Sequence, residues 1–440
     1  MRWLVMDLLY LTVLKRLKFT KLGKVYDIAI IGGGAAGLYA AATLSSLNAQ
    51  GAGLSFVVLE KMHRCGLKIG ITGKGRCNLT NTKPWNEFAQ HVHPKNVFLK
   101  NAFYGMSNTA TMEFYESIGL PLTVERGDRV FPQSMKALDV VSVLERHIKT
   151  NGGEIIRNAP VNSLETLSVG ACDANFPPDN LFKITHSLNE TIHAKRVIIA
   201  TGGMSYPTTG STGDGYDFAK LLGHKISPCF PSLTALIPKN YKSDYHGISL
   251  KNVQVQLMVN GFSVQEEFGD LDFTNGGIEG PIGFKVSRKA VHSIINGQKV
   301  SIIMDMKPAV SLEQLESRIQ REIADIKGDK LKGVLPKLLP SKLVPLFVEA
   351  NQGLTLNNLA EKLKGWSFNI QGYVGYERCV VTAGGIKLDE VSQKTMESKL
   401  VKGLFFAGEV LDLDGDTGGY NLQIAFSTAA MAAQNAAKGL

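Results

Sequence analysis

The chain of 440 residues is long enough for two or three domains, and its composition, with 44% hydrophobic and 20% charged residues, is that of a globular protein. Its five cysteines are odd in number and show no C-x-x-C spacing, which argues against a disulfide framework, a zinc site or a redox dithiol and favours a cytoplasmic location. The net charge is +9, but residues 1–24 carry six basic side chains and one acidic one, so about half of the excess belongs to one segment. The charge therefore predicts no nucleic-acid partner.

Residues 3–14, WLVMDLLYLTVL, form an apolar segment near the start of the sequence. A helix that spans a bilayer needs about 20 apolar residues, so no membrane span is predicted. The basic stretch follows the apolar residues instead of preceding them, and there is no small-residue cleavage site, which argues against a signal peptide. Residues 1–23 are therefore interpreted as an N-terminal extension, with an interfacial helix as the alternative.

A βαβ unit follows this extension. An apolar strand is predicted over 26–31, a helix begins near Ala35, and a second strand over 55–60 ends in Glu60. Further elements are predicted as helices over 109–119 and 137–150 and as strands over 154–165 and 182–199. This order is typical of a Rossmann-like α/β domain.

The turn between the first strand and the helix reads GGGAAG, residues 32–37, and matches the pattern G-x-G-x-x-G. Gly32 permits the tight turn, Gly34 lets the backbone approach a pyrophosphate, and Gly37 lets the helix pack closely on the strand. The helix N-terminus supplies N–H groups and a positive partial charge. Glu60 can accept hydrogen bonds from an adenosine ribose, so the segment predicts dinucleotide binding. An exposed charge at the strand end is the alternative for Glu60.

A glycine-rich and basic loop, KIGITGKGRCNLTN, covers residues 68–81. Its glycines let the backbone follow a ligand closely, and Arg76 can pair with a pyrophosphate or clamp a carboxylate. A solvated basic loop is the alternative. The segment ATGGMSYPTTGSTGDG at 200–215 follows a predicted strand and brings backbone near a cofactor at Gly202, although a simple turn has the same composition.

The sequence pattern changes after Tyr206. Residues 253–259, VQVQLMV, alternate strictly between apolar and polar, and the following Asn260-Gly261 pair is a strong hairpin turn. A further strand is predicted over 299–306. These features predict an inserted antiparallel barrel or sandwich.

Residues 311–365 carry helical signals instead. Ser311 and Gln314 form a capping-box pattern, and apolar residues recur behind them at helical spacing. They predict a small helical subdomain. Strand patterns return over 372–383 and 403–407.

The segment GEVLDLDGDTGGYNLQIAFSTAA, residues 408–430, follows the last predicted strand. The segment offers four carboxylates, Glu409, Asp412, Asp414 and Asp416, and one of them can hold ribitol hydroxyls. The N-terminus of the following alanine-rich helix can stabilise negative charge on a reduced flavin. The acidic cluster also suggests calcium, but the EF-hand pattern fails because no Glu closes the loop at its twelfth position. No metal site is predicted.

Six segments, IIGGGAAGLYAA, TGKGRCNLTN, GDRVFP, ATGGMSYPTTGSTGDG, VTAGGI and GEVLDLDGDTGGYNLQIAFSTAA, are distinctive. Together they resemble a family of bacterial NAD(P)/FAD-dependent oxidoreductases, some of them aminoacetone-oxidase-like, over nearly all of the chain after residue 24. The ATGG…TGDG segment is also similar to fumarate reductase flavoproteins. The resemblance implies an α/β fold in which a discontinuous Rossmann-like FAD-binding domain holds an inserted antiparallel β-barrel and a small helical subdomain. The implied boundaries are 24–206 and 380–440 for the FAD-binding domain, 207–310 and 366–379 for the barrel, and 311–365 for the helical part.

The resemblance also implies a set of FAD contacts in the matching motifs. These are Gly32, Gly34, Gly37, Glu60, Arg76, Cys77, Asn78, Gly408, Asp412, Gly419, Tyr420, Asn421 and Gln423. Neighbouring residues in the same glycine-rich and charged segments complete the predicted set. They are Ala36, Lys61, Lys68, Thr72, Gly73, Gly75, Gly202, Glu409 and Gly418.

One loop departs from the family pattern. Family members often read F-T-H-x-G-x-S-G-P, whereas this chain reads FTNGGIEGP at 273–281, so Asn275 replaces a histidine and Glu279 replaces a serine. If this loop contacts the substrate, specificity or proton delivery differs here. Candidate substrate contacts are Arg129, Tyr206, Asn275 and Glu279.

The predicted function is an FAD-dependent oxidoreductase that moves a hydride between a small-molecule substrate and flavin N5, with the FAD bound noncovalently. The second substrate is oxygen or NAD(P)H. Because the chain shows one convincing Rossmann fingerprint, NAD(P)H would dock transiently as a reductant. The alternative is a flavin-binding protein that associates with RNA or a membrane and has no redox catalysis of its own.

Overall fold

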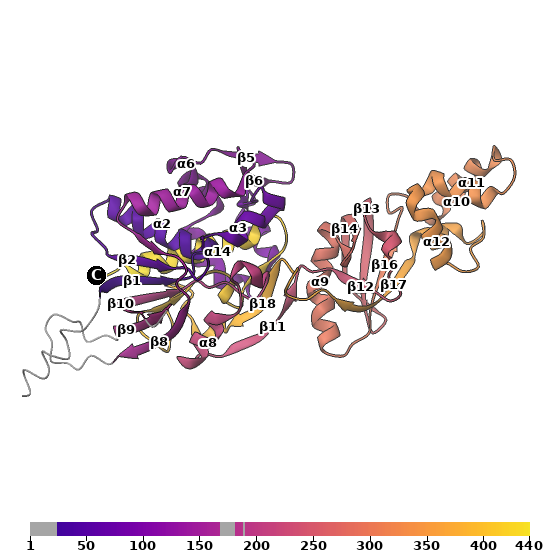
Figure 1. Cartoon of the computed structure of the whole chain (residues 1–440). Coiled ribbons are helices and arrows are strands. Elements are labelled where there is room, and N and C mark those ends of the chain that lie inside the picture. The colour runs from indigo at the N-terminus through magenta and orange to yellow at the C-terminus, as the bar shows by residue number, and fades with distance from the viewer. Residues whose placement is uncertain (1–23, 168–180, 188–189) are drawn as a thin grey trace, which may run out of the picture. The chain divides into compact units, whose positions relative to one another are not determined.

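The computed structural model describes residues 24–167, 181–187 and 190–440 (Figure 1). The extension predicted over 1–23 lies outside the described residues. The described chain forms two compact units. Unit 1 contains the residues up to Cys229 together with Gly384–Leu440, and unit 2 contains Phe230–Ala383.

A mostly parallel sheet forms the centre of unit 1. Its strand order is β7-β2-β1-β10-β9-β8, and β19 pairs in parallel with the second half of β10. The pairs from β7 to β10 are parallel, whereas β10, β9 and β8 pair antiparallel. The strands are β1 (Val25–Ile31), β2 (Phe56–Leu59), β7 (Glu154–Ile156), β8 (Val161–Leu167), β9 (Leu181–His186), β10 (Glu190–Ile199) and β19 (Leu404–Phe406).

Two alanine-rich helices lie side by side in unit 1. They are α2 (Ala35–Ala49) and α14 (Tyr420–Ala436), and α7 (Ala137–Thr150) packs on α2 (Figure 1). Tyr39 of α2 stacks on Phe426 of α14 with the ring centroids 4.7 Å apart. This packing brings the first and the last glycine-rich segments of the sequence into one unit.

Short elements complete unit 1. The helices are α3 (Leu67–Ile71), α4 (Trp85–Phe88), α5 (Asn96–Gly105), α6 (Asn108–Ser117) and α8 (Asp214–Leu221), with 3₁₀ turns η1 (Thr72–Gly75), η2 (Ala89–His91), η3 (Pro207–Thr209), η6 (Leu388–Glu390) and η7 (Gly408–Val410). The strands are β3 (Thr80–Asn81), β4 (Val92–His93), β5 (Leu122–Glu125), β6 (Arg129–Pro132) and β20 (Asp414–Gly415). Strands β11 (Ile226–Ser232) and β18 (Val381–Ile386) pair with each other and carry the chain into and out of unit 2.

The structure differs from the sequence expectation at several boundaries. Residues 207–229, expected in the insert, belong to unit 1 because Tyr216, Phe218 and Ala219 of α8 are buried in its core. The strand expected over 154–165 is split into β7 and β8, since Asn158 between them has a φ of 54°. The strand expected over 372–383 is likewise two strands, and the first of them, β17, begins at Trp366.

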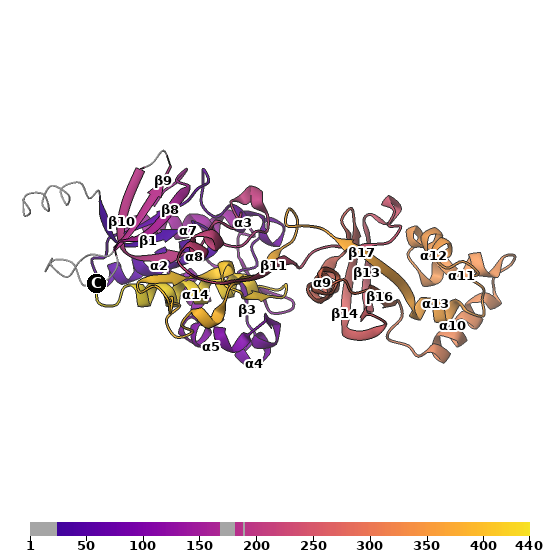
Figure 2. The same cartoon turned by 90° about the horizontal axis from the view of Figure 1, so that it is seen from below.

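Unit 2 contains a closed barrel in the order β12-β15-β14-β13-β16-β17, so the predicted α/β class with an antiparallel barrel is confirmed. Figure 2 shows the barrel with the helices that follow it. The strands are β12 (Leu236–Pro238), β13 (Ile248–Val259), β14 (Phe262–Thr274), β15 (Gly277–Glu279), β16 (Val300–Asp305) and β17 (Trp366–Tyr373), with turn η4 (Ser243–Tyr245) before β13 and helix α9 (Gly280–Ile295) after β15.

The region predicted to be helical over 311–365 forms four helices of unit 2. They are α10 (Leu312–Ala324), α11 (Lys330–Leu338), α12 (Val344–Ala350) and α13 (Leu359–Lys364), with turn η5 (Ser341–Leu343). The expected capping box is present, because Ser311 Oγ accepts from Gln314 N and the Gln314 side chain accepts from Ser311 N. Leu315 and Ile319 share one hydrophobic cluster with barrel residues such as Trp366, so the helices extend the core of the barrel.

Candidate functional site

The turn between β1 and α2 depends on two glycines that have no room for a side chain. A Cβ atom on Gly32 would lie 2.6 Å from the carbonyl oxygen of Ala200, and one on Gly37 would lie 1.8 Å from the carbonyl oxygen of Gly32. Both distances are shorter than any real Cβ contact. These residues therefore fix the close approach of β1, α2 and the end of β10, as the fingerprint requires.

Gly34 has a different environment. A Cβ atom placed on it would meet no heavy atom of the described residues within 4 Å. Gly34 is also the N-cap of α2, and no side chain of the described residues caps the helix there. Since the first N–H groups of a helix have no intrahelical acceptor, those of Ala36 and Gly37 remain available beside open space. This cradle fits the pyrophosphate of FAD.

Glu60 joins the glycine turn to the end of β2. Its carboxylate accepts from Gly33 N at 2.7 Å and from Met62 N at 2.8 Å, and the residue is 8% exposed. Burial raises the pKa of Glu60, while these two backbone bonds oppose the rise. An ionised carboxylate has about four acceptor positions, so the predicted ribose contact is compatible with both backbone bonds.

Two lysines of the predicted set are paired with acidic side chains. Lys61 donates to Asp214 in the first turn of α8 at 2.7 Å. Lys68 donates to Glu409 at 2.8 Å and also to Ser205, whose hydroxyl donates to Glu409 at 2.8 Å. The cluster of Lys68, Ser205 and Glu409 joins three separate motifs of the sequence. Its two charged side chains are mostly buried, with 23% of Lys68 and 19% of Glu409 exposed.

The loop that contains the predicted residues Thr72, Gly73 and Gly75 turns sharply. Gly73, Lys74, Gly75 and Cys77 all have a positive φ, between 56° and 85°. The turn closes with a hydrogen bond from Cys77 N to Thr72 O of 3.1 Å. Cys77 is fully buried, and burial raises the pKa of its thiol to about 12, so this cysteine is an inert neutral side chain at pH 7.

Two asparagines connect this loop to the N-terminus of α14. Asn81 donates to Gly418 O at 3.0 Å. Asn78, in the amide orientation that satisfies both of its ends, accepts from Gly419 N at 3.0 Å and donates to Thr80 O at 2.9 Å. A Cβ atom on Gly419 would lie 2.4 Å from the Thr80 carbonyl carbon, so glycine is required there.

Gly408 lies between the first turn of α2 and the body of α14. A Cβ atom on Gly408 would lie 2.7 Å from the Cβ atom of Ala36, and Gly408 N donates to Thr428 of α14 at 2.9 Å. No side chain of the described residues caps α14, which leaves the first N–H groups of Tyr420 and Asn421 available. Unit 1 thus contains two helices, α2 and α14, whose N-termini have no side-chain cap among the described residues.

A histidine pair holds the loop before α14. His91 Nδ1 lies 2.8 Å from one oxygen of Asp416, and His93 Nε2 lies 3.2 Å from the other. The His91 ring also packs on Tyr420, with the centroids 4.5 Å apart. Asn421 closes the loop, since its side chain accepts from Gly415 N and donates to Gly415 O.

Replacing Asp416 with Asn is expected to lower the free energy of unfolding by about 2 kcal/mol at pH 7. Burial raises the pKa of Asp416, but the bonds from His91 and His93 outweigh burial and lower the pKa from 3.8 to about 2. A depressed pKa stabilises the fold above pH 3.8, and this contribution is lost as the pH falls through about 2. Urea unfolding of wild type and D416N between pH 7 and pH 2 measures the difference.

The control is Asp389→Asn, because Asp389 pairs with Lys95 on the surface with 83% of its side chain exposed. D389N is expected to unfold like the wild type. Equal stability of D416N and wild type at pH 7 would contradict the role assigned to the histidine pair.

Other predicted residues occupy different surroundings. Gln423 is fully buried, and its amide nitrogen lies within hydrogen-bond distance of Met106 O, Thr111 Oγ1 and Ser427 Oγ, which ties α14 to the ends of α5 and α6. Asp412 is half-buried, and its backbone N–H donates to Ile386 O at 3.0 Å. These bonds give Gln423 a packing role, which the motif alone does not indicate.

Arg76 and Arg129 share one carboxylate on the small sheet β3-β6-β5. Arg76 Nη1 donates to Glu125 at 3.0 Å, Arg129 lies 3.7 Å from the same side chain, and the Arg76 guanidinium covers the Phe131 ring at 4.6 Å. Tyr206 has a φ of 53° at the start of η3. The pyrophosphate contact predicted for Arg76 and the substrate contacts predicted for Arg129 and Tyr206 remain predictions.

The substrate candidates of the barrel form a cluster in unit 2. Asn275 and Glu279 both contact Arg378, at 2.8 Å and 3.4 Å. Arg378, His91 and His93 are not among the residues predicted from the sequence. Arg378 could have been noticed because it lies just before the VTAGGI motif. The two histidines could have been noticed because they stand two positions apart in the segment HVHP, residues 91–94.

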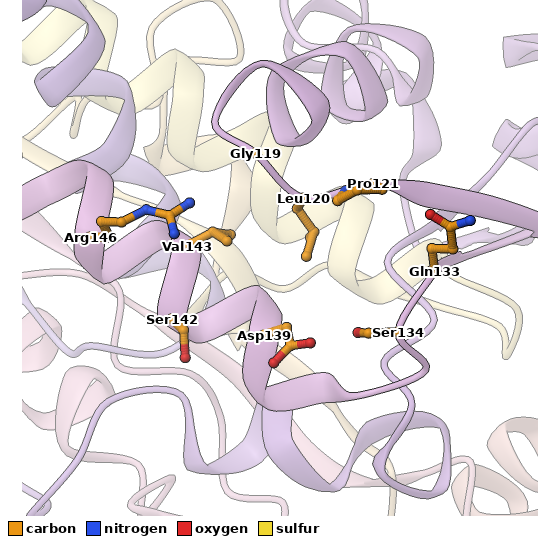
Figure 3. Close-up of a pocket in the computed structure, with 9 residues that line it drawn as sticks. All are labelled: Gly119, Leu120, Pro121, Gln133, Ser134, Asp139, Ser142, Val143 and Arg146. Atoms are coloured by element: carbon orange, nitrogen blue, oxygen red, sulfur yellow. The ribbon is translucent and has the colours of Figure 1, made fainter.

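An open pocket of about 480 Å³ lies elsewhere in unit 1, between α7 and the chain around β5 and β6 (Figure 3). Asp139, Ser142 and Arg146 line it from α7, while Leu120 and Gln133 line it from the opposite side. None of the predicted FAD contacts lines this pocket. The described residues contain no cluster of His, Cys, Asp and Glu that could hold a metal ion. No helix within them is long and apolar enough to cross a membrane.

Comparison with known proteins gives consistent results. A family model described as "HI0933-like protein Rossmann domain" matches residues 26–435. The chain is 29% identical over 423 residues to the 3-dehydro-bile acid delta(4,6)-reductase of Clostridium scindens, covering 93% of this chain and 99% of that protein. It is 30% identical over 416 residues to the ribosomal RNA dihydrouridine synthase of Haemophilus influenzae, covering 91% of this chain and 96% of that protein.

The fold is also that of a solved flavoenzyme structure. The 3-ketosteroid-delta4-(5alpha)-dehydrogenase from Rhodococcus jostii RHA1 matches with a TM-score of 0.51 and 14% identity, covering 95% of this chain and 98% of that one. The resemblance inferred from the sequence motifs is thereby confirmed. The chain belongs to the HI0933-like Rossmann-domain family and is an FAD-dependent oxidoreductase of that family.

Proposed function

We propose that this protein is a reductase that saturates a carbon–carbon double bond conjugated to a carbonyl group, with NAD(P)H as the electron donor. The observation that carries the proposal is the open cradle at Gly34, beside the uncapped N-terminus of α2, in a chain that is similar to a bile acid reductase over nearly its whole length. The overall reaction adds a hydride and a proton to the double bond and converts NAD(P)H to NAD(P)⁺. NAD(P)H supply suits a cytoplasmic protein.

The names of two relatives support this reaction class. A 3-dehydro bile acid with double bonds at positions 4 and 6 has them in conjugation with its C3 carbonyl. Dihydrouridine forms when the C5=C6 bond of uridine, which is conjugated to the C4 carbonyl, is reduced. The two substrates differ in size and charge but share this conjugated group, so we propose it for the present chain.

The residues of unit 1 would bind and orient the cofactor. The N–H groups at Ala36 and Gly37 would hold the pyrophosphate, and Glu60 would hold the adenosine ribose. The N-terminus of α14 would stabilise negative charge at the flavin ring. When bound, FAD supplies two-electron hydride chemistry that the side chains of the protein lack. The single Rossmann fingerprint is used by FAD, so the nicotinamide dinucleotide would bind transiently.

Anaerobic mixing of the yellow holoprotein with NADPH or NADH is expected to bleach the flavin absorbance. Adding a 3-oxo-Δ4 bile acid or a uridine-containing ribosomal RNA should then restore the absorbance and yield one reduced double bond per flavin. Reoxidation by the bile acid supports the predicted small-molecule substrate, whereas reoxidation by the RNA replaces it with a nucleic acid.

Three results would argue against the proposal. A failure of both nicotinamides to bleach the flavin would exclude the reductant and favour a flavin-binding protein without redox catalysis. Bleaching that only oxygen reverses would indicate an oxidase. A colourless protein that does not take up added FAD would exclude the cofactor itself.

A further inference from the structure

We infer that the open pocket beside α7 binds a short zwitterionic peptide, with the ammonium group of the peptide at Asp139 and its carboxylate at Arg146. All residues that line the pocket belong to unit 1. None of the predicted FAD contacts lines it, so the pocket is separate from the predicted cofactor site. The inference therefore goes beyond the proposed reduction and does not depend on it.

One wall of the pocket is a single face of α7. Asp139, Val143 and Arg146 follow each other at intervals of four and three residues, the spacing that places side chains in one row along a helix. Figure 3 shows this row, with the Leu120 side chain directed at it from the opposite wall. Leu120 is 3% and Val143 is 6% exposed, so these two residues form an apolar floor on which a ligand can bury carbon atoms.

The opposite wall is held by backbone hydrogen bonds. Gln133 N donates to Pro121 O at 2.8 Å. This bond continues the pairing of β5 with β6, in which Leu122 lies opposite Pro132. The pocket is therefore preformed, and preformed sites bind small ligands at a lower cost in conformational entropy.

Asp139 provides an unpaired negative charge at one end of the pocket. Its side chain is half-buried and has no hydrogen bond or ion pair with another described residue. Asp139 stands in the first turn of α7, where the helix dipole stabilises the ionised carboxylate. An ionised carboxylate has about four acceptor positions, so Asp139 can accept hydrogen bonds from an ammonium group.

Arg146 provides an unpaired positive charge at the other end. Its Nη2 donates to Ile118 O at 2.9 Å, which fixes the guanidinium against the loop at Gly119. The neighbouring Glu145 pairs with Arg157 at 2.7 Å, and within the described chain Arg146 has no acidic partner. The remaining N–H donors of the guanidinium lie in one plane and match the two oxygens of a carboxylate.

The distance between the two charges sets the length of the ligand. Asp139 and Arg146 are seven residues apart, which corresponds to about 10.5 Å along the helix axis. A single amino acid is too short to reach both, because its charged groups flank one carbon atom. An extended peptide spans about 3.3–3.6 Å per residue, so a dipeptide or tripeptide has the required length. The cavity of about 480 Å³ is within the usual size of small-molecule sites.

The polar groups between the two ends suit a peptide bond. The Ser142 hydroxyl donates to Leu138 O at 2.9 Å, which leaves its oxygen as an acceptor for a peptide N–H. The Gln133 amide makes no hydrogen bond to the rest of the described chain and can donate to a peptide carbonyl. Opposite charges at the two ends disfavour a nucleotide, whose phosphates Asp139 would repel, and a polyamine, which Arg146 would repel.

Titration calorimetry of the full-length protein with bound FAD tests the inference, with the dipeptide leucyl-leucine as the probe. N-acetyl-leucyl-leucine lacks the ammonium group, and leucyl-leucine amide lacks the carboxylate. Each of these capped peptides is expected to bind the wild type about tenfold more weakly, because a hydrogen bond to a charged group is lost at one end. Equal Kd values for the three peptides, or no binding at millimolar concentration, would overturn the inference.

Two variants assign the ends of the ligand. Asp139→Asn should weaken leucyl-leucine about tenfold and leave N-acetyl-leucyl-leucine unchanged, because that peptide has no ammonium group to lose. Arg146→Gln should weaken leucyl-leucine by a similar factor and leave the amide unchanged. A variant that weakens its capped peptide as much as the dipeptide disturbs the pocket as a whole, and that result would contradict the assigned contact.

The matched controls are Asp217→Asn on α8 and Arg318→Gln on α10. Asp217 pairs with Lys220 at 3.1 Å, Arg318 lies 4.0 Å from Glu322, and neither lines the pocket. Both controls should bind all three peptides like the wild type. Thermal unfolding and flavin content show whether each variant is folded.

The bond from Arg146 to Ile118 O also supports the loop, so Arg146→Lys is the second variant if Arg146→Gln does not fold. Lysine keeps the charge without the planar fork, and a loss smaller than that of the glutamine variant is expected. The capped peptides test the same two contacts on the wild type without any substitution. Peptide binding and flavin reduction are measured separately, so failure of the proposed reduction leaves this test intact.

Discussion

A Gly37→Ala protein is expected to be colourless and to lose on the order of 4 kcal/mol of stability. The added methyl carbon would lie 1.8 Å from the carbonyl oxygen of Gly32, a backbone atom that cannot move without displacing β1 or α2. Because both elements are central to unit 1, no nearby flexible side chain can absorb the clash. Thermal unfolding should shift downward by roughly 10 °C, and FAD should be absent after purification.

Gly34→Ala separates cofactor binding from folding. Gly34 has a φ of −82°, which any residue adopts, and a Cβ atom there meets no described atom within 4 Å. G34A should unfold within about 1 kcal/mol of the wild type, since alanine is only a poorer N-cap than glycine. Its methyl group would occupy the space proposed for the pyrophosphate, so the Kd for FAD should rise at least tenfold. A G34A protein with wild-type affinity would show that FAD does not bind at this turn.

The second large effect is expected for Gly419→Ala. This residue has a φ of 88°, and its Cβ atom would lie 2.4 Å from the carbonyl carbon of Thr80. The substitution would separate the start of α14 from the loop that contains Asn78. We expect the FAD released on mild heating to increase and the unfolding free energy to fall by about 3 kcal/mol.

Gly223→Ala is the control that isolates the clash from backbone strain. Gly223 has a φ of 92°, close to that of Gly419, but a Cβ atom there has no described neighbour within 4 Å. The two alanine variants therefore pay a similar cost for the left-handed conformation, of about 1 kcal/mol. If they lose equal stability and bind FAD equally well, the contact between Gly419 and Thr80 has no importance for the site.

The sequence predicted the elements whose signals are local. The turn at Gly32 and Gly37 follows from an apolar strand, a glycine pattern and a helix within a dozen residues. The capping box at Ser311 needs only four residues in succession. In both cases the partners lie within one or two turns of each other, so backbone geometry and composition specify the result.

The remaining features depend on partners that are distant in the sequence. Gln423 matches a cofactor motif, yet its amide binds Met106 and Thr111, which lie more than 300 positions earlier. Likewise, the charge of Arg76 suggested a phosphate ligand, whereas Glu125 and Phe131 determine its local contacts. A single sequence does not specify such pairings, because they are set by tertiary packing.

The order of segments in unit 1 has a consequence for biosynthesis. β19 lies beside Val197, Ile198 and Ile199 of β10, and α14 packs on α2, but both follow the whole of unit 2 in the chain. The ribosome therefore synthesises the barrel before it synthesises β19 and α14. Until then, the apolar edge of β10 that pairs with β19 is exposed to solvent. A polypeptide truncated within the barrel would lack α14, whose N-terminus is proposed to stabilise the flavin, and would expose this flank to proteases and chaperones. Flavin uptake would thus distinguish finished molecules from interrupted ones.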